Sequence, residues 1–115
     1  MIERDSRFLL GLQLMEQGDY AEAADEFEDL FFEAVRDEVE FVRVFLQLAT
    51  GLHHVDRGTE RAAIERLEEG IIAADKVQNW RGFDGPKIRN VIQEAENAIR
   101  DGRRPPSPQI RPVND

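Results

Sequence analysis

Apolar residues recur along this chain with the spacing of amphipathic α-helices, and the most apolar stretch runs from Val39 to Val55. Wound as a helix at about 100° per residue, this stretch places apolar side chains over well more than half of its circumference. A helix with so wide an apolar face must be covered on at least two sides. The pattern therefore predicts a central helix around which the rest of the chain packs.

The N-terminal part of the chain predicts two helices before the central one. The first begins at Asp5 or Ser6 and stops at Gly18. The second begins at Asp19, with Glu22 placed three residues later as a capping box requires. Both carry apolar residues at intervals of three and four, which predicts that each buries one face.

Two more helices are predicted after the central one. Thr59 is a suitable N-cap for the fourth helix, and Pro86 fits the first turn of the fifth. The periodicity lapses over residues 77–85, where Trp80 and Phe83 are expected to fold back over the core. An exposed patch of Trp80 and Phe83 that binds a partner is the alternative.

These elements predict an all-α, single-domain bundle of about five helices, formed by two antiparallel helical hairpins and a closing C-terminal helix. The bundle domain is expected to occupy residues 1–102. Residues 103–115 contain four prolines among thirteen residues, which predicts an extended or disordered tail rich in proline and arginine.

The two hairpins share a weak internal repeat. An offset of 40 residues lays Gly11 on Gly51 and Phe27 on Leu67. The segment from Gly11 to Leu30 also fits the tetratricopeptide pattern, although the period is longer than the roughly 34 residues of that repeat. We therefore expect a tetratricopeptide-like hairpin geometry in a compact bundle.

The charge balance narrows the range of partners. The chain has 24 acidic and 15 basic residues, a net charge of −9, and no cysteine. An acidic surface repels phosphate backbones, so nucleic-acid binding is disfavoured. Lysine is nearly absent, which is typical either of proteins from a cytoplasm with molar salt or of a genome that prefers arginine codons. Neither a membrane span nor a secretory signal is recognisable, so a cytoplasmic protein is the expectation.

A polar stripe on the central helix is the candidate functional site. Arg43, Gln47, Thr50 and His54 follow one another at intervals of three or four and therefore share one face. An antiparallel second helix could bring acids to that face. The candidate cluster comprises Asp25, Glu28, Arg43, Gln47, Thr50 and His54. Such a cluster is either a solvated face or an internal polar network, a small-ligand or peptide groove, or a metal or catalytic site.

Two stretches of the chain resemble a known family. EAADEFE at residues 22–28 and LQLATGLHH at residues 46–54 are similar to the motifs of domain-of-unknown-function family 309. The resemblance extends over about residues 8 to 100. It departs from the family pattern at Ala24, where the family has histidine, and at Phe31, where it has tryptophan. The resemblance implies an all-α bundle and no established activity.

Two hypotheses for function follow. The first is a non-enzymatic module that uses a hairpin groove to bind an unidentified protein or peptide partner. The second is a small-ligand or divalent-metal site, hydrolytic in one version, built from Glu28, Gln47 and His54, which would have to converge in one enclosed pocket. We expect no cofactor, no nucleic acid and no membrane as partners, and a homodimer is left open.

Overall fold

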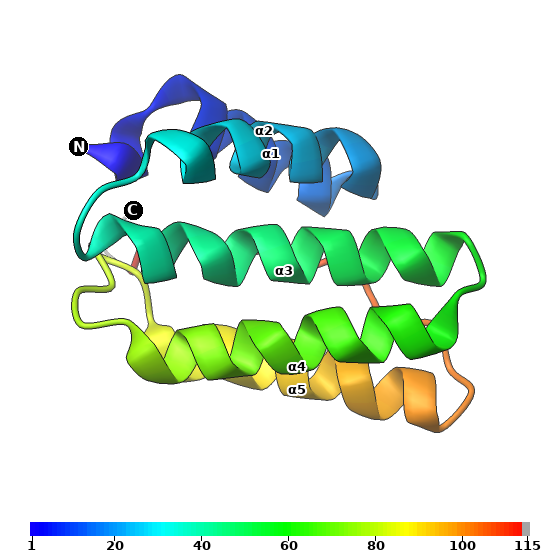
Figure 1. Ribbon diagram of the computed structural model, residues 1–115. Helices are drawn as coiled ribbons and strands as arrows, with labels where there is room; N and C mark the ends of the chain where they lie inside the picture. Colours follow the sequence, from blue (N-terminus) through cyan, green and yellow to red (C-terminus); the bar gives the residue numbers. More distant parts are fainter. Residues whose placement is uncertain (114–115) are drawn as a thin grey trace.

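The chain forms a bundle of five α-helices in the computed structural model, which describes residues 1–113 (Figure 1). After a 3-10 turn, η1 (Ile2–Arg4), come α1 (Ser6–Glu16), α2 (Tyr20–Glu33), α3 (Glu38–Asp56), α4 (Glu60–Lys76) and α5 (Gly85–Arg100). Residues 1–113 contain no strand, and the helix order is the expected one. The predicted all-α bundle is therefore confirmed.

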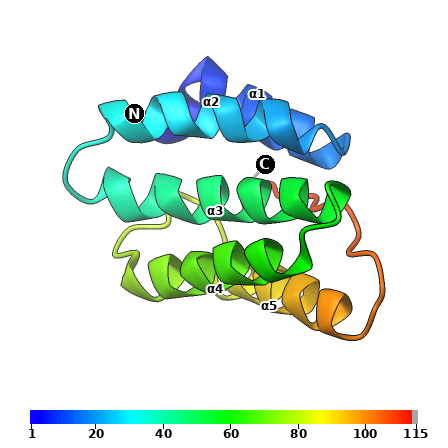
Figure 2. The ribbon, with the colours of Figure 1, turned by 45° about the vertical axis from the view of Figure 1, so that its right-hand side comes forward.

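Helix α3 lies at the centre of the bundle. Figures 1 and 2 show it between α1 and α2 on one side and α4 and α5 on the other. Its buried residues are Phe41, Val42, Val44, Phe45, Leu48, Ala49, Gly51 and Leu52. Burial of each large side chain among these contributes about 1.5–3 kcal/mol. The wide apolar face read from the sequence is thus covered on both sides.

Five phenylalanine rings form the middle of the core. They are Phe8 of α1, Phe27 of α2, Phe41 and Phe45 of α3, and Phe83 of the loop before α5. The centroids of Phe8 and Phe45 are 5.0 Å apart in an edge-to-face arrangement. Phe83 is 6% exposed, and the half-buried Trp80 packs edge-on against Phe41.

Glycines at positions 40 residues apart give the two hairpins the same close packing. A Cβ atom on Gly11 would lie 2.6 Å from the Phe27 ring, and one on Gly51 would lie 2.9 Å from Leu67. Each glycine thus lets the returning helix approach the backbone of the preceding one. The residues that the repeat aligned in sequence make equivalent contacts in space.

The helix caps differ from prediction at two positions. Asp5 caps α1 by accepting a hydrogen bond from the Arg7 backbone N–H at 2.9 Å. Asp19 and Thr59 occupy the N-cap positions of α2 and α4, but neither side chain makes a capping bond. A capping box would need the Glu22 carboxylate to accept a hydrogen bond from the Asp19 backbone N–H. That N–H already donates to the Leu14 carbonyl in the tight turn, so the capping box does not form.

The nearly buried Arg81 forms ion pairs with two other parts of the chain. The Arg81 guanidinium is 3.2 Å from a Glu3 carboxylate oxygen and 2.7 Å from one of Asp37. Its side chain is only 10% exposed. It therefore joins η1, the connection from α2 to α3 and the loop before α5, and it does so from a left-handed backbone conformation with φ 55°.

The proline-rich tail is extended and packed on the bundle. Residues 103–113 have no regular secondary structure, yet Pro105, Pro108 and Ile110 are buried. The sequence predicted either an extended or a disordered tail, and the segment is extended as far as residue 113. Apolar side chains hold the segment on the bundle, because Ile110 belongs to the core cluster and Pro105 and Pro108 are also buried. Asn114 and Asp115 lie outside the described residues.

Candidate functional site

The predicted polar stripe exists on α3, and three of its members, Arg43, Gln47 and His54, contact neighbouring residues of the chain. Arg43 is half-buried, with its Nε 3.2 Å from a Glu40 carboxylate oxygen and its guanidinium carbon 4.8 Å from the centre of the Phe31 ring. Gln47 packs against α4 beside Gly70. Arg43 and Gln47 are thus half-buried by contacts within the chain, and the buried Arg43 Nε has the Glu40 ion pair but no hydrogen bond in the part of the chain that the structure describes.

His54 lies at the far end of the stripe, in the last turn of α3. Its Nδ1 is 3.0 Å from the Thr59 hydroxyl, which itself donates to the His54 carbonyl at 3.1 Å. Burial lowers the pKa of His54, and electrostatic interactions with His53, Arg57 and Arg66 lower it further. The His54 ring is consequently neutral at pH 7 and poorly suited to act as a general acid there.

The acids expected to join the stripe remain on the surface of α2. Asp25 and Glu28 are exposed, and in residues 1–113 neither side chain forms a hydrogen bond or an ion pair. The register explains the separation. Phe31 packs on Arg43 and Phe27 lies 5.8 Å from Phe45, so the two helices run antiparallel with Glu28 near the level of Phe45.

His54 follows Phe45 by nine residues, which is about 14 Å along the helix axis. The structure therefore does not bring Glu28 to His54. Within residues 1–113 it also assembles no group of three or more histidine, aspartate or glutamate side chains able to hold a metal ion. The small-ligand or metal hypothesis lacks the convergence that it required.

Trp80 and Phe83 pack over the core as the sequence predicted, and the alternative of an exposed patch at these residues is wrong. Phe83 is buried among the other phenylalanines, and Trp80 covers Phe41. The exposed aromatic side chain is instead Phe32, with 76% of its surface accessible. The sequence could have predicted this exposure. Adjacent residues on a helix point about 100° apart, so Phe31 and Phe32 cannot both face the core.

Phe32 belongs to an acidic face of α2 that we call the α2 surface. It comprises Asp25, Glu28, Asp29 and Phe32, at helical intervals of three and four, and Val35, which follows α2. All five residues are exposed, Val35 to 58%. The neighbouring Glu33 is different, because it is held by Arg7 of α1 at 2.6 Å.

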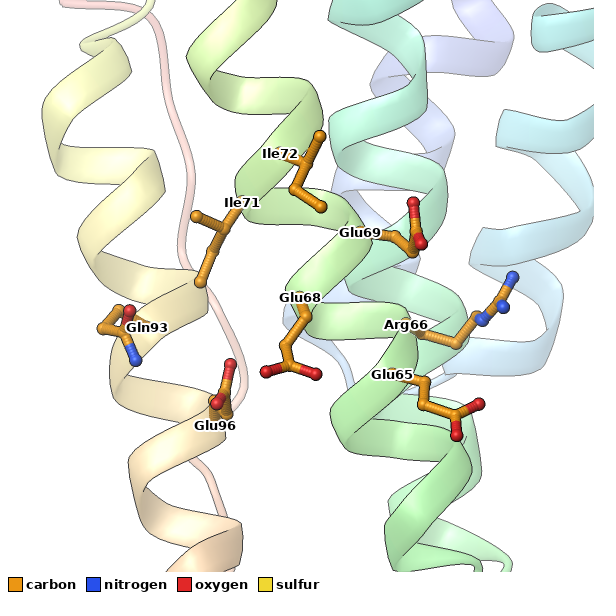
Figure 3. A pocket seen from close by; sticks show the side chains of 8 residues that line it. All are labelled: Glu65, Arg66, Glu68, Glu69, Ile71, Ile72, Gln93 and Glu96. Atoms are coloured by element: carbon orange, nitrogen blue, oxygen red, sulfur yellow. The ribbon is translucent and has the colours of Figure 1, made fainter.

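A hollow with a volume of about 600 Å³ lies between α4 and α5. Figure 3 shows Glu68 of α4 and Glu96 of α5 facing each other across it. Glu65 and Glu69 also line it, so it is unfavourable for an anion. Arg100 lies 2.9 Å from Glu96 and 3.5 Å from Glu68, which neutralises the innermost acids. This hollow is an open acidic surface with its own counter-charge.

Comparison with known proteins identifies the family. No curated protein and no solved structure matches the chain. None of the helices within residues 1–113 has the length and apolar content of a membrane-spanning helix. A family model described as Domain of unknown function (DUF309) matches residues 8–65, which run from α1 into α4 and include the whole α3 stripe. The chain therefore belongs to the DUF309 family.

Proposed function

We propose that this chain is a non-enzymatic protein-interaction module that binds a basic, amphipathic segment of a partner protein through the α2 surface. The observation that carries the proposal is Phe32, a large apolar side chain that is 76% exposed at the end of an acidic helix face. Isolated exposed apolar residues are common on protein surfaces. Phe32 is distinguished by its neighbours, because Val35 extends the apolar area and unpaired acids border it.

The acids of the α2 surface are available to a partner. Asp25, Glu28 and Asp29 make no ion pair within the chain as far as residue 113. Together with the net charge of −9, they favour encounter with a basic segment and accelerate its association. Contact between Phe32 and an apolar side chain of the partner would then supply about 1.5–3 kcal/mol.

The geometry of the α2 surface fits a helical partner. Asp25 and Phe32 are seven residues apart, or about 10 Å along α2. A partner helix that spans this distance presents about two turns, with lysine or arginine opposite the acids and an apolar residue opposite Phe32. Such packing of an amphipathic helix against another helix is a common recognition mode.

The test uses a labelled synthetic amphipathic peptide of leucine and lysine, with a leucine–glutamate peptide of the same pattern as the control ligand. We expect the basic peptide alone to bind, with an affinity that falls as KCl is raised. Phe32→Ser should weaken binding about tenfold to a hundredfold. A double variant, Glu28→Gln with Asp29→Asn, should weaken it and flatten its salt dependence.

Matched variants separate this site from general attraction to an acidic protein. Ile72→Ser removes another exposed apolar side chain, 48% accessible on α4, and Glu94→Gln removes an exposed acid of α5. Neither should change the dissociation constant by more than about twofold. If Ile72→Ser weakens binding as much as Phe32→Ser, the α2 surface is not the binding site and the proposal is wrong.

A further inference from the structure

The C-terminal segment, residues 103–113, is held on the bundle by contacts distributed along its length. Figures 1 and 2 show it leaving the end of α5 and passing back along the bundle. Its polar contacts join Arg104 to Asp56 at 2.6 Å, the hydroxyl groups of Ser107 and Tyr20 at 2.8 Å, Arg111 to Glu16 at 2.7 and 3.1 Å, and the Val113 N–H to the Gly82 carbonyl at 2.7 Å.

These contacts have the form of peptide recognition. The buried prolines Pro105 and Pro108 are three residues apart, the period of a polyproline helix, and Ile110 adds a third buried side chain. Arg111 donates two hydrogen bonds to one carboxylate, which is both strong and specific in geometry. The bond from Arg111 also lowers the pKa of Glu16. The bundle therefore binds an extended segment through apolar side chains, a charge pair and the backbone.

The segment does not fill the surface on which it lies. A cavity of about 400 Å³ separates residues 109–113 from α5, where Ile88 and Val91 line it together with Gln109. A second cavity of about 330 Å³ lies on the other side of Pro112, beside Leu9 and Phe83. The exposed Gln109 lines this cavity together with the apolar Ile88 and Val91, at a mouth that also carries charged residues of α5 and of the segment. A larger apolar residue in place of Gln109 would bury more surface against Ile88 and Val91.

We propose that this surface, the tail groove, is a peptide-binding site for an extended, basic, proline-containing segment of a partner protein, and that the chain's own C-terminal segment is a competing intramolecular ligand. The best ligand keeps arginine at the position of Arg111 and carries a large apolar residue at that of Gln109. The tail groove is separate from the α2 surface, and the inference stands on its own contacts.

Competition with the attached segment sets the affinity of the intact protein. A ligand on a short flexible connection acts at an effective concentration of the order of millimolar. A free peptide of the same sequence must displace it and binds more weakly for that reason. A ligand that also fills the cavity beside Ile88 and Val91 gains the apolar burial that the attached segment lacks.

The experiment measures binding of a labelled peptide with the sequence of residues 103–113 to the full chain. In the released variant, Ile110→Asp with Arg111→Glu, the attached segment loses a buried side chain and its ion pair with Glu16. We expect the released variant to bind the peptide at least about tenfold more tightly than the unmodified chain. A peptide with Gln109→Leu should bind about tenfold more tightly again.

Charge reversal distinguishes recognition from a loss of structure. Glu16→Arg, introduced into the released variant, should abolish binding of the original peptide, and a peptide with Arg111→Glu should restore it. Glu60→Arg, which reverses an exposed acid at the start of α4, is the control and should change nothing. Phe32→Ser should also leave this binding unchanged, so failure here and failure at the α2 surface are distinguishable.

Three results would overturn the proposal. The first is a released variant that is folded but does not bind the peptide, or that binds it without rescue by charge reversal. The second is an unfolded released variant and an unfolded Arg111→Glu variant, which would make the segment an integral part of the core. The third is an unmodified chain that is a dimer and a released variant that is a monomer, since the occupant would then be the segment of a second copy.

Discussion

Replacing Gly11 with alanine tests the close packing that the two hairpins share. A new Cβ atom would lie 2.6 Å from the Phe27 ring, about 0.9 Å inside the optimal carbon–carbon separation of about 3.5 Å. The Phe27 side chain cannot yield, because it is fully buried and packs against Phe8 and Phe45 with centroids 5.8 Å away on each side. The helices α1 and α2 must therefore separate.

The magnitude follows from two opposing contributions. Alanine is favoured over glycine in a helix interior by about 0.5–1 kcal/mol. Overpacking a buried contact costs about 1–3 kcal/mol. Gly70→Ala provides the control, because a Cβ atom there meets Gln47 and Ile92 at 3.4 and 3.5 Å, which are ordinary contacts. We expect Gly70→Ala to stabilise the protein by about 0.5–1 kcal/mol and Gly11→Ala to destabilise it.

Urea unfolding followed by circular dichroism measures the difference between the two variants. Helix propensity cancels in this comparison, so the free energies of unfolding should differ by the overpacking contribution alone, about 1–3 kcal/mol. Gly51→Ala should also destabilise the protein, because its new Cβ atom would lie 2.9 Å from the Leu67 side chain. The reasoning is refuted if Gly11→Ala is as stable as Gly70→Ala, because α1 and α2 would then accommodate the extra methyl group without a loss of stability.

Three further predictions concern charge and backbone conformation. Arg36 and Arg81 both have a left-handed backbone conformation with φ 55°, which is unfavourable for a residue other than glycine. Replacing the exposed Arg36 with glycine removes this strain and should stabilise the protein by up to about 1 kcal/mol. Replacing Arg81 with glycine should destabilise the protein, because Glu3 and Asp37 then lose their ion-pair partner. Urea unfolding measures the free energy of unfolding of both variants. The pKa of His54 is lowered below 6.5 in the folded state, so its contribution to stability is complete above pH 6.5 and declines as the pH falls towards the folded pKa. His54→Asn should flatten the stability profile in this window, and an unchanged profile in a pH series of urea titrations would contradict the assignment. Finally, raising KCl from about 0.1 to 1 M shortens the Debye length from about 10 to 3 Å; with a net charge of −9 the thermal midpoint should rise, and a fall would mean that the surface ion pairs outweigh the repulsion.

The sequence by itself determined the helices and their order. The central position of α3 follows from the width of its apolar face, and its observed bounds, Glu38–Asp56, lie within one residue of the predicted stretch at each end. Asp5, one of the two expected starting residues, caps α1. The 40-residue offset between Gly11 and Gly51 was visible in the sequence, and the structure adds that both glycines make the same kind of close contact. These features are local or periodic, and local propensity and hydrophobic period are properties that a sequence displays directly.

The tertiary structure alone decided which side chains meet. Glu28 and His54 remain apart because the packing of Phe27 on Phe45 fixes the register of α2 against α3, and no periodicity within one helix reports the register between two. Phe32 is exposed because its neighbour Phe31 takes the place beside Arg43. The C-terminal segment has a partner surface only once α1, α5 and the loop before α5 are assembled. Its composition could therefore predict an extended chain, and only the folded bundle could supply the groove that holds it.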